Sequence, residues 1–282
     1  MTPNEFDALV AQGYNRIPVV CEVLADLDSP LSVYLKLVEG PFGFLFESVQ
    51  GGEKWGRYSI IGLPCRTILR TRDRQITVET DGRLVESATV EDPLAFVEEF
   101  KARFRVPELP DLPRFSGGLV GYFGYETVAY IEPRLRNPGK PDPLGCPDVL
   151  LMVSDELVVF DNLSGRMYLI VHADLDRGDT LADTNRRIRG LIERMQQGAP
   201  RHRPRHSRNV SEADFVSGFT EHGFKRAVER IKQYILDGDC MQVVISQRLS
   251  IPFEARPLDL YRALRGLNPC LLYTSDAADE SS

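Results

Sequence analysis

The sequence predicts an α+β fold in which mixed or antiparallel sheets are flanked by helices. Short segments rich in β-branched and aromatic residues follow one another, separated by turn residues. Helical segments are scattered among them and do not alternate regularly with strands, and no G-x-G-x-x-G or Walker A pattern occurs. A regular strand–helix–strand series would instead predict a parallel sheet.

Four helix starts are predicted from capping residues in the first 195 residues. Thr2, Ser29 and Asp92 each precede a proline, which suits the first helical position because its missing N–H would be unpaired there anyway. Thr180 is followed at capping-box spacing by Asp183. Apolar residues at helical spacing follow each start, so we expect four helices.

Single strands are predicted over residues 19–24, 42–48 and 58–61, with the glycine-flanked loop GGEKWG between the last two. Two hairpins are also predicted. The first pairs residues 66–72 with 75–79, and the second pairs 156–160 with 166–172. The turn of the second is supplied by Asp161, Asn162, Ser164 and Gly165.

The segment FSGGLVGYFGYE, residues 115–126, places four glycines among aromatic side chains. A phosphate cradle is one interpretation, but no Lys-Ser or Lys-Thr follows it. Glycine in a strand often marks a close approach of two backbones, and this interpretation is favoured.

The pattern changes after residue 195. Residues 196–210 are polar, contain two prolines and read as a linker. An amphipathic helix is predicted over residues 220–238, and residues 241–251 alternate with the period of a strand. A last helix begins at Pro257 and stops at Asn268-Pro269. We therefore expect a first region over 1–195, the linker over 196–210, and the start of a second domain over 211–269.

Residues 270–282 differ in character from the rest of the chain. After Tyr273 the only apolar side chains are isolated alanines, and the string resembles translated adapter sequence. We expect this tail to be non-native and to replace the true continuation of the chain; a short disordered C-terminus is the alternative.

Composition excludes several functional classes. The chain has 282 residues, 43% hydrophobic and 27% charged, with a formal net charge of -7 and mixed signs. This argues against a general nucleic-acid binder. No run approaches the ~18 apolar residues of a membrane span, and no secretory signal is present. Five widely spaced cysteines without a C-x-x-C pattern predict free thiols in the cytoplasm.

Four stretches resemble the anthranilate synthase component I family, within the chorismate-utilising enzymes. They are residues 30–62 (with Leu45-Phe46-Glu47-Ser48 where the family has Leu-Leu-Glu-Ser), 115–128, 147–162 and 238–251. The resemblance implies the N-terminal part of that family's sandwich, with a second sheet left incomplete. It also implies amination of chorismate and loss of pyruvate to give anthranilate, with ammonia from a glutamine amidotransferase subunit (component II), bound Mg²⁺, and feedback inhibition by tryptophan.

The resemblance identifies residues 1–195 as the regulatory region and implies a tryptophan site. Ser48 matches the tryptophan-binding motif, and an amino-acid ligand also needs an acceptor and a cation, which Glu47 and Arg57 would supply. On a strand, neighbouring residues point to opposite faces, so only one of Glu47 and Ser48 can reach a pocket while the other packs. The residues implied for this site are Ser48, Glu47, Arg57, Tyr58, Asn268 and Pro269.

Gln242 is the candidate catalytic residue, because the matching strand position selects the nucleophile in the wider superfamily. Lysine there suits activation of water, whereas glutamine cannot act as a base at neutral pH and suits ammonia. Val244 favours the anthranilate branch over aminodeoxychorismate synthase, which is the catalytic alternative. The family's later motifs, including its magnesium ligands, do not occur in these residues. We therefore expect no metal site and no turnover from this chain, which could instead be a non-catalytic tryptophan-binding fragment.

Overall fold

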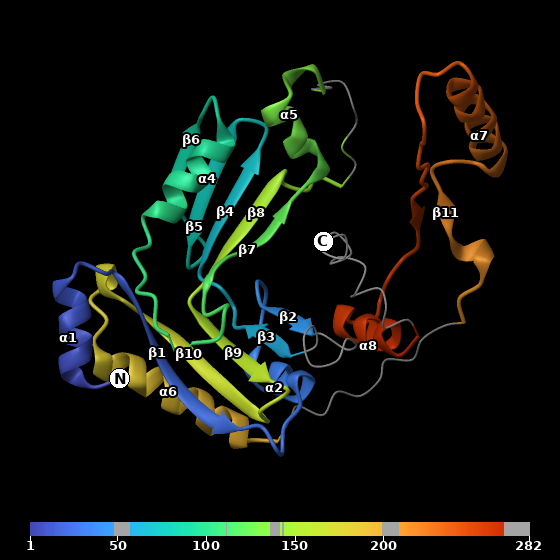
Figure 1. The fold of residues 1–282 in the computed structure, drawn as a ribbon. Coiled ribbons are helices and arrows are strands. Elements are labelled where there is room, and N and C mark those ends of the chain that lie inside the picture. Colours follow the sequence, from blue (N-terminus) through green and yellow to red (C-terminus); the bar gives the residue numbers. More distant parts are fainter. Residues whose placement is uncertain (48–56, 111, 136–141, 143, 199–208, 268–282) are drawn as a thin grey trace. The chain divides into compact units, whose positions relative to one another are not determined.

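The structure is a computed structural model that describes residues 1–47, 57–110, 112–135, 142, 144–198 and 209–267 (Figure 1). The chain divides into two compact units, with the boundary between Arg201 and His202. The first unit contains two five-stranded antiparallel sheets and the helices that pack on them. The predicted α+β class, with antiparallel sheets and flanking helices, is confirmed.

The first sheet has the spatial order β1-β10-β9-β3-β2 (Figure 1). Its strands are β1 (Arg16–Leu24), β10 (Arg166–Asp174), β9 (Glu156–Asp161), β3 (Tyr58–Gly62) and β2 (Phe44–Glu47). The predicted hairpin of β9 and β10 is present, and Gly165 in its turn has a φ of 65° that glycine adopts readily. β1 begins before the predicted start and includes Pro18, which is tolerated because β1 lies at the edge of the sheet.

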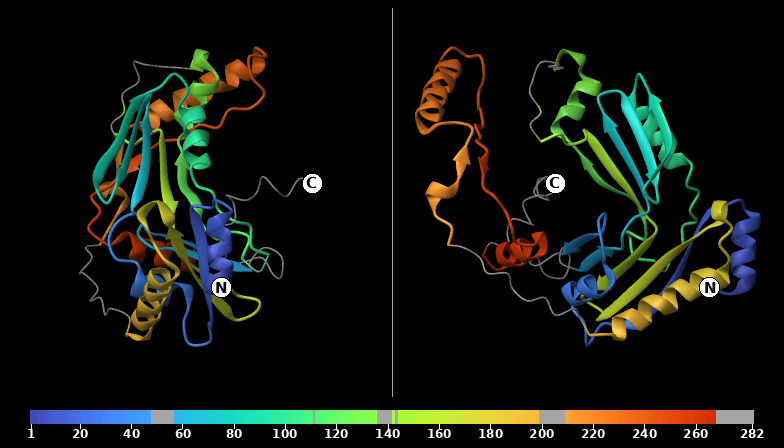
Figure 2. Two further views of the ribbon diagram at one scale, coloured as in Figure 1. Left: turned by 90° about the vertical axis from the view of Figure 1, so that its left-hand side faces the viewer. Right: turned by 180° about the vertical axis from the view of Figure 1, so that it is seen from behind.

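Three helices cover one face of the first sheet: α1 (Pro3–Ala11), α2 (Pro30–Leu37) and α6 (Leu181–Gln196). The right-hand view of Figure 2 shows α6 (gold) running alongside β10, a strand that it contacts. Apolar side chains of the helices, such as Leu37 and Ile188, pack in one cluster with Leu169 and Val158 of the strands. Burying each such side chain contributes roughly 1.5–3 kcal/mol. This cluster is the main core of the first unit.

The second sheet has the order β6-β5-β4-β8-β7. Its strands are β4 (Thr67–Arg72), β5 (Gln75–Thr80), β6 (Arg83–Thr89), β7 (Gly118–Phe123) and β8 (Val149–Ser154). Helix α4 (Pro93–Ala102) packs on it through Phe96, Val97 and Phe100, and the short α5 (Val128–Ile131) follows β7. The predicted hairpin of β4 and β5 is confirmed. β6 was not predicted, because its edge position leaves Leu84 and Val85 exposed.

The capping predictions are confirmed at all four helix starts. Thr2, Ser29 and Thr180 each form a capping box, and the Asp92 side chain accepts hydrogen bonds from two backbone N–H groups of α4. These bonds pair backbone donors that a helix cannot satisfy internally, so each start is determined by a few neighbouring residues.

The second unit contains, among its described residues, α7 (Glu221–Leu236), α8 (Pro257–Leu267) and the two-stranded pairing of β11 (Val216–Ser217) with β12 (Leu249–Ser250). Both helices were predicted. The strand predicted over residues 241–251 was wrong in its extent, because only Leu249 and Ser250 have a partner strand. Alternation alone does not make a strand where no second strand supplies the ladder.

None of the helices in the described ranges is both long enough and apolar enough to cross a membrane. The four cysteines that lie in these ranges are free thiols, as predicted. The tail at 270–282 and most of the predicted linker lie outside the described residues.

Candidate functional site

The region predicted to bind an amino acid centres on neighbouring strands β2 and β3. Glu47 ends β2 and pairs with Ser59 of β3. Its side chain is only 9% exposed. Residues directly opposite each other share a face, and Ser59 and Ile61 lie on the same face of β3. Ile61 belongs to the core cluster beneath the helices, so Glu47 lies on the helix-covered face.

Tyr58 begins β3 and lies on the opposite face from Glu47. It packs with Leu157, Val159 and Ile170 in a separate cluster. The structure therefore places Glu47 and Tyr58 on neighbouring strands but on opposite faces of the sheet. Two further predicted members, Asn268 and Pro269, lie outside the described residues, as does Ser48.

Arg57 precedes β3 and is held by a carboxylate that sequence analysis missed. Its Nε and Nη2 donate to the two Asp161 carboxylate oxygens at 3.0 and 2.7 Å, and the guanidinium lies 4.9 Å from the Tyr58 ring centre. Asp161 is 2% exposed and also accepts from the backbone N–H groups of Leu163 and Ser164. Its hydrogen bonds with Arg57 lower the Asp161 pKa.

This bidentate pair changes the interpretation of Arg57. Arg57 was expected to offer a cation to the carboxylate of a ligand, but its charge is already compensated by Asp161. The sequence did carry a signal, since the turn beginning at Asp161 was recognised. The turn pattern did not reveal that the Asp161 carboxylate pairs with Arg57, which lies 104 positions away in the sequence.

Gln242, the predicted catalytic residue, lies in the second unit in an extended, exposed segment outside any strand. Its neighbours Met241 and Val244 are 97% and 84% exposed. The predicted strand face that would present Gln242 to a substrate is therefore not formed among the described residues.

The glycine-rich segment forms β7 at the edge of the second sheet. A Cβ added to Gly121 would lie 1.8 Å from the carbonyl oxygen of Leu150 on β8. A side chain at this position is incompatible with the strand pairing, so Gly121 permits close backbone approach. The interpretation of this glycine as a packing residue is confirmed.

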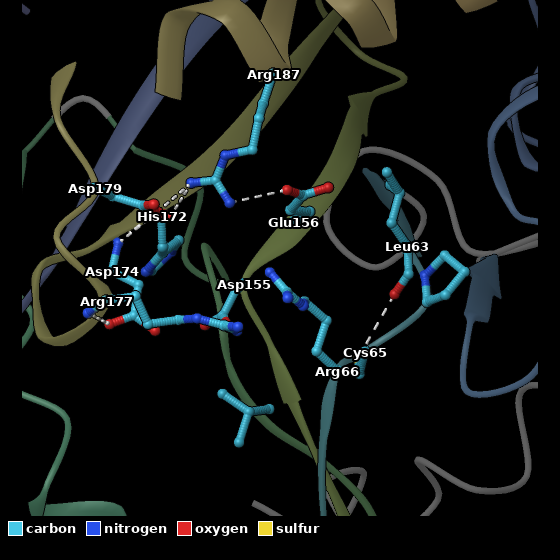
Figure 3. Close-up of a pocket in the computed structure, with 12 residues that line it drawn as sticks. Leu63, Cys65, Arg66, Asp155, Glu156, His172, Asp174, Arg177, Asp179 and Arg187 are labelled. Atoms are coloured by element: carbon cyan, nitrogen blue, oxygen red, sulfur yellow. Dashed lines mark hydrogen bonds and ion pairs between the residues drawn. The ribbon is translucent and has the colours of Figure 1, made fainter. Parts of the chain in front are cut away.

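A polar cavity that sequence analysis did not predict lies where β8 passes into β9 (Figure 3). It measures about 80 Å³. Asp155 joins the two strands, and its carbonyl accepts from the His172 backbone N–H at 2.8 Å. Arg187 of α6 reaches into this group, donating to Asp179 at 2.9 Å and to Glu156 at 3.2 Å.

Titratable groups in this cavity have shifted pKa values. Burial raises the Asp155 pKa to about 6, and burial lowers the His172 pKa. Burial also raises the Cys65 pKa to about 12, which leaves a thiol of low reactivity. The cavity is large enough for only a few water molecules, and Arg187 is paired with carboxylates. Its polar network joins the strands and α6 and does not form an organic ligand site.

The resemblance implies a magnesium ion, which binds through oxygen ligands such as carboxylates. In the part of the chain that the structure describes, no group of three or more His, Cys, Asp or Glu side chains could hold a metal ion. The described residues therefore do not fit a Mg²⁺ site.

Residues 46–274 match the family of chorismate binding enzymes. The chain belongs to this family. It is 56% identical over 274 residues to the anthranilate synthase component 1 of Pseudomonas aeruginosa, covering 95% of this chain and 55% of that protein. The protein of the same name from Neisseria gonorrhoeae is 50% identical over 272 residues, with the same coverage of both chains.

A solved structure of a protein from this family has a similar fold. The crystal structure of anthranilate synthase component I from Streptococcus pneumoniae TIGR4 is similar with a TM-score of 0.62 at 26% sequence identity, covering 88% of this chain and 52% of that one. The resemblance predicted from the four motifs is confirmed. The chain spans about half the length of the curated relatives that it matches.

Proposed function

We propose that these residues are part of an anthranilate synthase component I, which converts chorismate and ammonia to anthranilate and pyruvate in tryptophan biosynthesis. The identity of 56% over 95% of the chain to a protein of that name carries the proposal. Ammonia would come from a glutamine amidotransferase subunit, with Mg²⁺ on the substrate carboxylate, and the enzyme would act in the cytoplasm.

Gln242 is proposed as the residue that selects ammonia as the nucleophile. Its amide neither accepts nor releases a proton at neutral pH, so it cannot activate water as a lysine base would. Ammonia needs no such activation. Val244, two positions later, supports the anthranilate branch of the superfamily. For this role Gln242 must be presented by a paired strand, a condition that the complete enzyme would have to supply.

Residues 1–195 are proposed as the region that binds tryptophan for feedback inhibition, residues 196–210 as a linker and residues 211–269 as the start of the catalytic domain. Ser48 is the principal proposed contact, with Asn268 and Pro269. The burial of Glu47 supports a packing role for it beside Ser48. Arg57 and Tyr58 are proposed to shape the region through the pair with Asp161, rather than to bind the ligand carboxylate.

The test compares the 282-residue chain with the complete reading frame that contains it. With chorismate, Mg²⁺ and ammonium, the complete product is expected to release anthranilate, detected by fluorescence and identified by mass. The 282-residue chain is expected to release none, since elimination of pyruvate needs an acid–base group and metal ligands that its described residues do not gather. Release of aminodeoxychorismate by the complete product would refute the proposed reaction.

A control variant separates nucleophile choice from loss of folding. Gln242→Lys in the complete product is expected to shift the reaction from amination toward addition of water, which changes the mass of the product. Gln247→Lys, in the same extended segment, serves as the matched control and is expected to leave the product unchanged. An unchanged product from Gln242→Lys would refute the role of Gln242 but not the family reaction.

A further inference from the structure

A second and larger cavity in the first unit has the size of a small-molecule site. It measures about 390 Å³ and is lined by elements that include α4, β7 and β8. Val97, Phe104, Leu119 and Leu151 form much of its apolar lining. Ligand sites commonly combine such a volume and apolar wall with a few polar groups.

Four charged side chains line this cavity, and three of them form ion pairs. Arg16 pairs with Asp174 at 2.6 Å, and Lys101 lies 3.4 Å from Glu98. The fourth, the partly exposed Asp155 carboxylate, accepts no side-chain hydrogen bond within the described ranges, although the charges of Arg16 and Arg187 act on it. Burial disfavours the charged form of a carboxylate, and Asp155 still has free hydrogen-bond acceptor capacity, so it is the group in this wall that a donor on a ligand would complement.

His172, which also lines this cavity, has no free N–H donor. His172 Nε2 lies 2.7 Å from the Ser116 carbonyl oxygen, which can only accept, so Nε2 carries the hydrogen. Burial lowers the His172 pKa, and the neutral ring then leaves Nδ1 as an acceptor. Asp155 and His172 both line the cavity, and both offer acceptors. A ligand that complements both acceptors must therefore carry a hydrogen-bond donor, preferably a cationic one.

We propose that this cavity binds a small ligand that carries a primary ammonium group on an apolar body, with the Asp155 carboxylate as its counter-ion. The ammonium supplies the donors and the positive charge, while the apolar body fills the space between α4 and strands β7 and β8. The proposal is independent of the proposed reaction, since all these residues lie in the first unit.

Binding through this carboxylate requires it to be ionised. The charged groups that act on Asp155 are Arg16, Glu156, Asp174 and Arg187. The other charged or titratable groups that line the two cavities beside it are Cys65, Arg66, Glu98, Lys101, His172, Arg177 and Asp179. Burial raises the Asp155 pKa to about 6. Affinity should therefore be constant well above this pH and fall about tenfold per unit below it, as the carboxylate is protonated.

Calorimetric titration of the 282-residue chain with 2-phenylethylamine tests the proposal. Saturable binding is expected at about pH 7.5, and binding about tenfold weaker at about pH 5. 2-Phenylethanol has the same apolar body without the charge, and 3-phenylpropanoate has the opposite charge; both are expected to bind at least about tenfold more weakly. L-Tryptophan is titrated separately. If the Asp155→Asn variant still binds L-tryptophan, the tryptophan site lies elsewhere.

Variants complete the test. Asp155→Asn is expected to weaken amine binding at least about tenfold and to remove its pH dependence. Glu22→Gln, at the far end of β1 in an exposed pair with Arg166, is the matched control and should bind as the parent does. Leu119→Trp should fill the cavity and abolish binding. Equal binding of 2-phenylethanol and the amine, unchanged binding by Asp155→Asn, or no saturation at about 10 mM would each overturn the proposal.

Discussion

The two compact units carry similar local patterns but differ in what those patterns bury. In the first unit, strands and helices enclose side chains such as Leu169, which is fully buried. In the second unit, no described residue is buried, although α7 and α8 are amphipathic and Thr220 caps α7. Caps and apolar spacing are therefore enough to define a helix, whereas a core requires a second layer of structure.

The strands show the same contrast. β9 and β10 form a hairpin with a turn of Asp and Gly, and each also pairs with a further strand. The alternating segment at 241–251 contributes only Leu249 and Ser250 to a pairing. An alternating pattern indicates which face of a strand would be buried. The hydrogen-bonded ladder forms only where a neighbouring strand is present.

Limited proteolysis should reveal the largest difference between the units. We expect cleavage within residues 209–267 to be at least about a hundredfold faster than within residues 57–110 and 144–195, because a packed core suppresses local opening. Cleavage sites mapped by mass spectrometry would test this, leaving aside cuts in the predicted linker. Similar rates in both units would show that the second unit is as well protected as the first.

Truncation of a side chain should have the next largest effect, with a greater loss of unfolding free energy in the first unit than in the second. Leu169→Ala is expected to lower the free energy of unfolding by about 2–5 kcal/mol, because it removes buried contacts and leaves a cavity. Leu264→Ala in α8, where the side chain is 42% exposed, is expected to cost less than about 1 kcal/mol. Urea unfolding followed by near-UV circular dichroism measures both. Equal losses would mean that Leu264 is buried in solution.

Two glycine substitutions should have opposite signs. Gly121→Ala is expected to destabilise the first unit by about 1–3 kcal/mol, because the added Cβ would meet the Leu150 backbone. Gly266→Ala in α8 meets nothing within 4 Å and should favour the helix by up to about 1 kcal/mol. Thermal melts and far-UV circular dichroism would detect both changes. A stabilised Gly121→Ala variant would contradict the close pairing of β7 and β8.

The buried carboxylate at Asp155 should make stability depend on pH. Its pKa is raised from 3.8 to about 6, so folding favours the protonated form. This stabilisation is fully present below about pH 4 and is lost as pH rises through about 6. Asp155→Asn mimics the protonated form and should raise stability by about 1–3 kcal/mol at about pH 8, with little effect at about pH 4.

The matched substitution in the second unit should have the smallest effect. Asp259→Asn in α8 breaks a partly exposed ion pair with Arg256, which is worth at most about 1 kcal/mol. Chemical denaturation of both variants across this pH range would test the pair. A larger effect at Asp259 than at Asp155 would reverse the expected order.

The candidate site was predictable only in part. The Glu-Ser motif and Gln242 were found because they occur in short, recognisable stretches, and the family itself is confirmed by the comparisons. Their spatial relations were not predictable. Glu47 and Tyr58 lie on opposite faces because of the register of β2 with β3, and register depends on partner strands.

The sequence by itself determined the helix starts, the two hairpins and the family, because each depends on residues close together in the chain or on motifs in a fixed order. Only the tertiary structure decided that Asp161 pairs with Arg57, that burial raises the pKa of Asp155, and that Gln242 lies outside a strand. These outcomes depend on contacts between residues far apart in sequence. Burial, charge pairing and strand partners arise only once those distant segments have packed together.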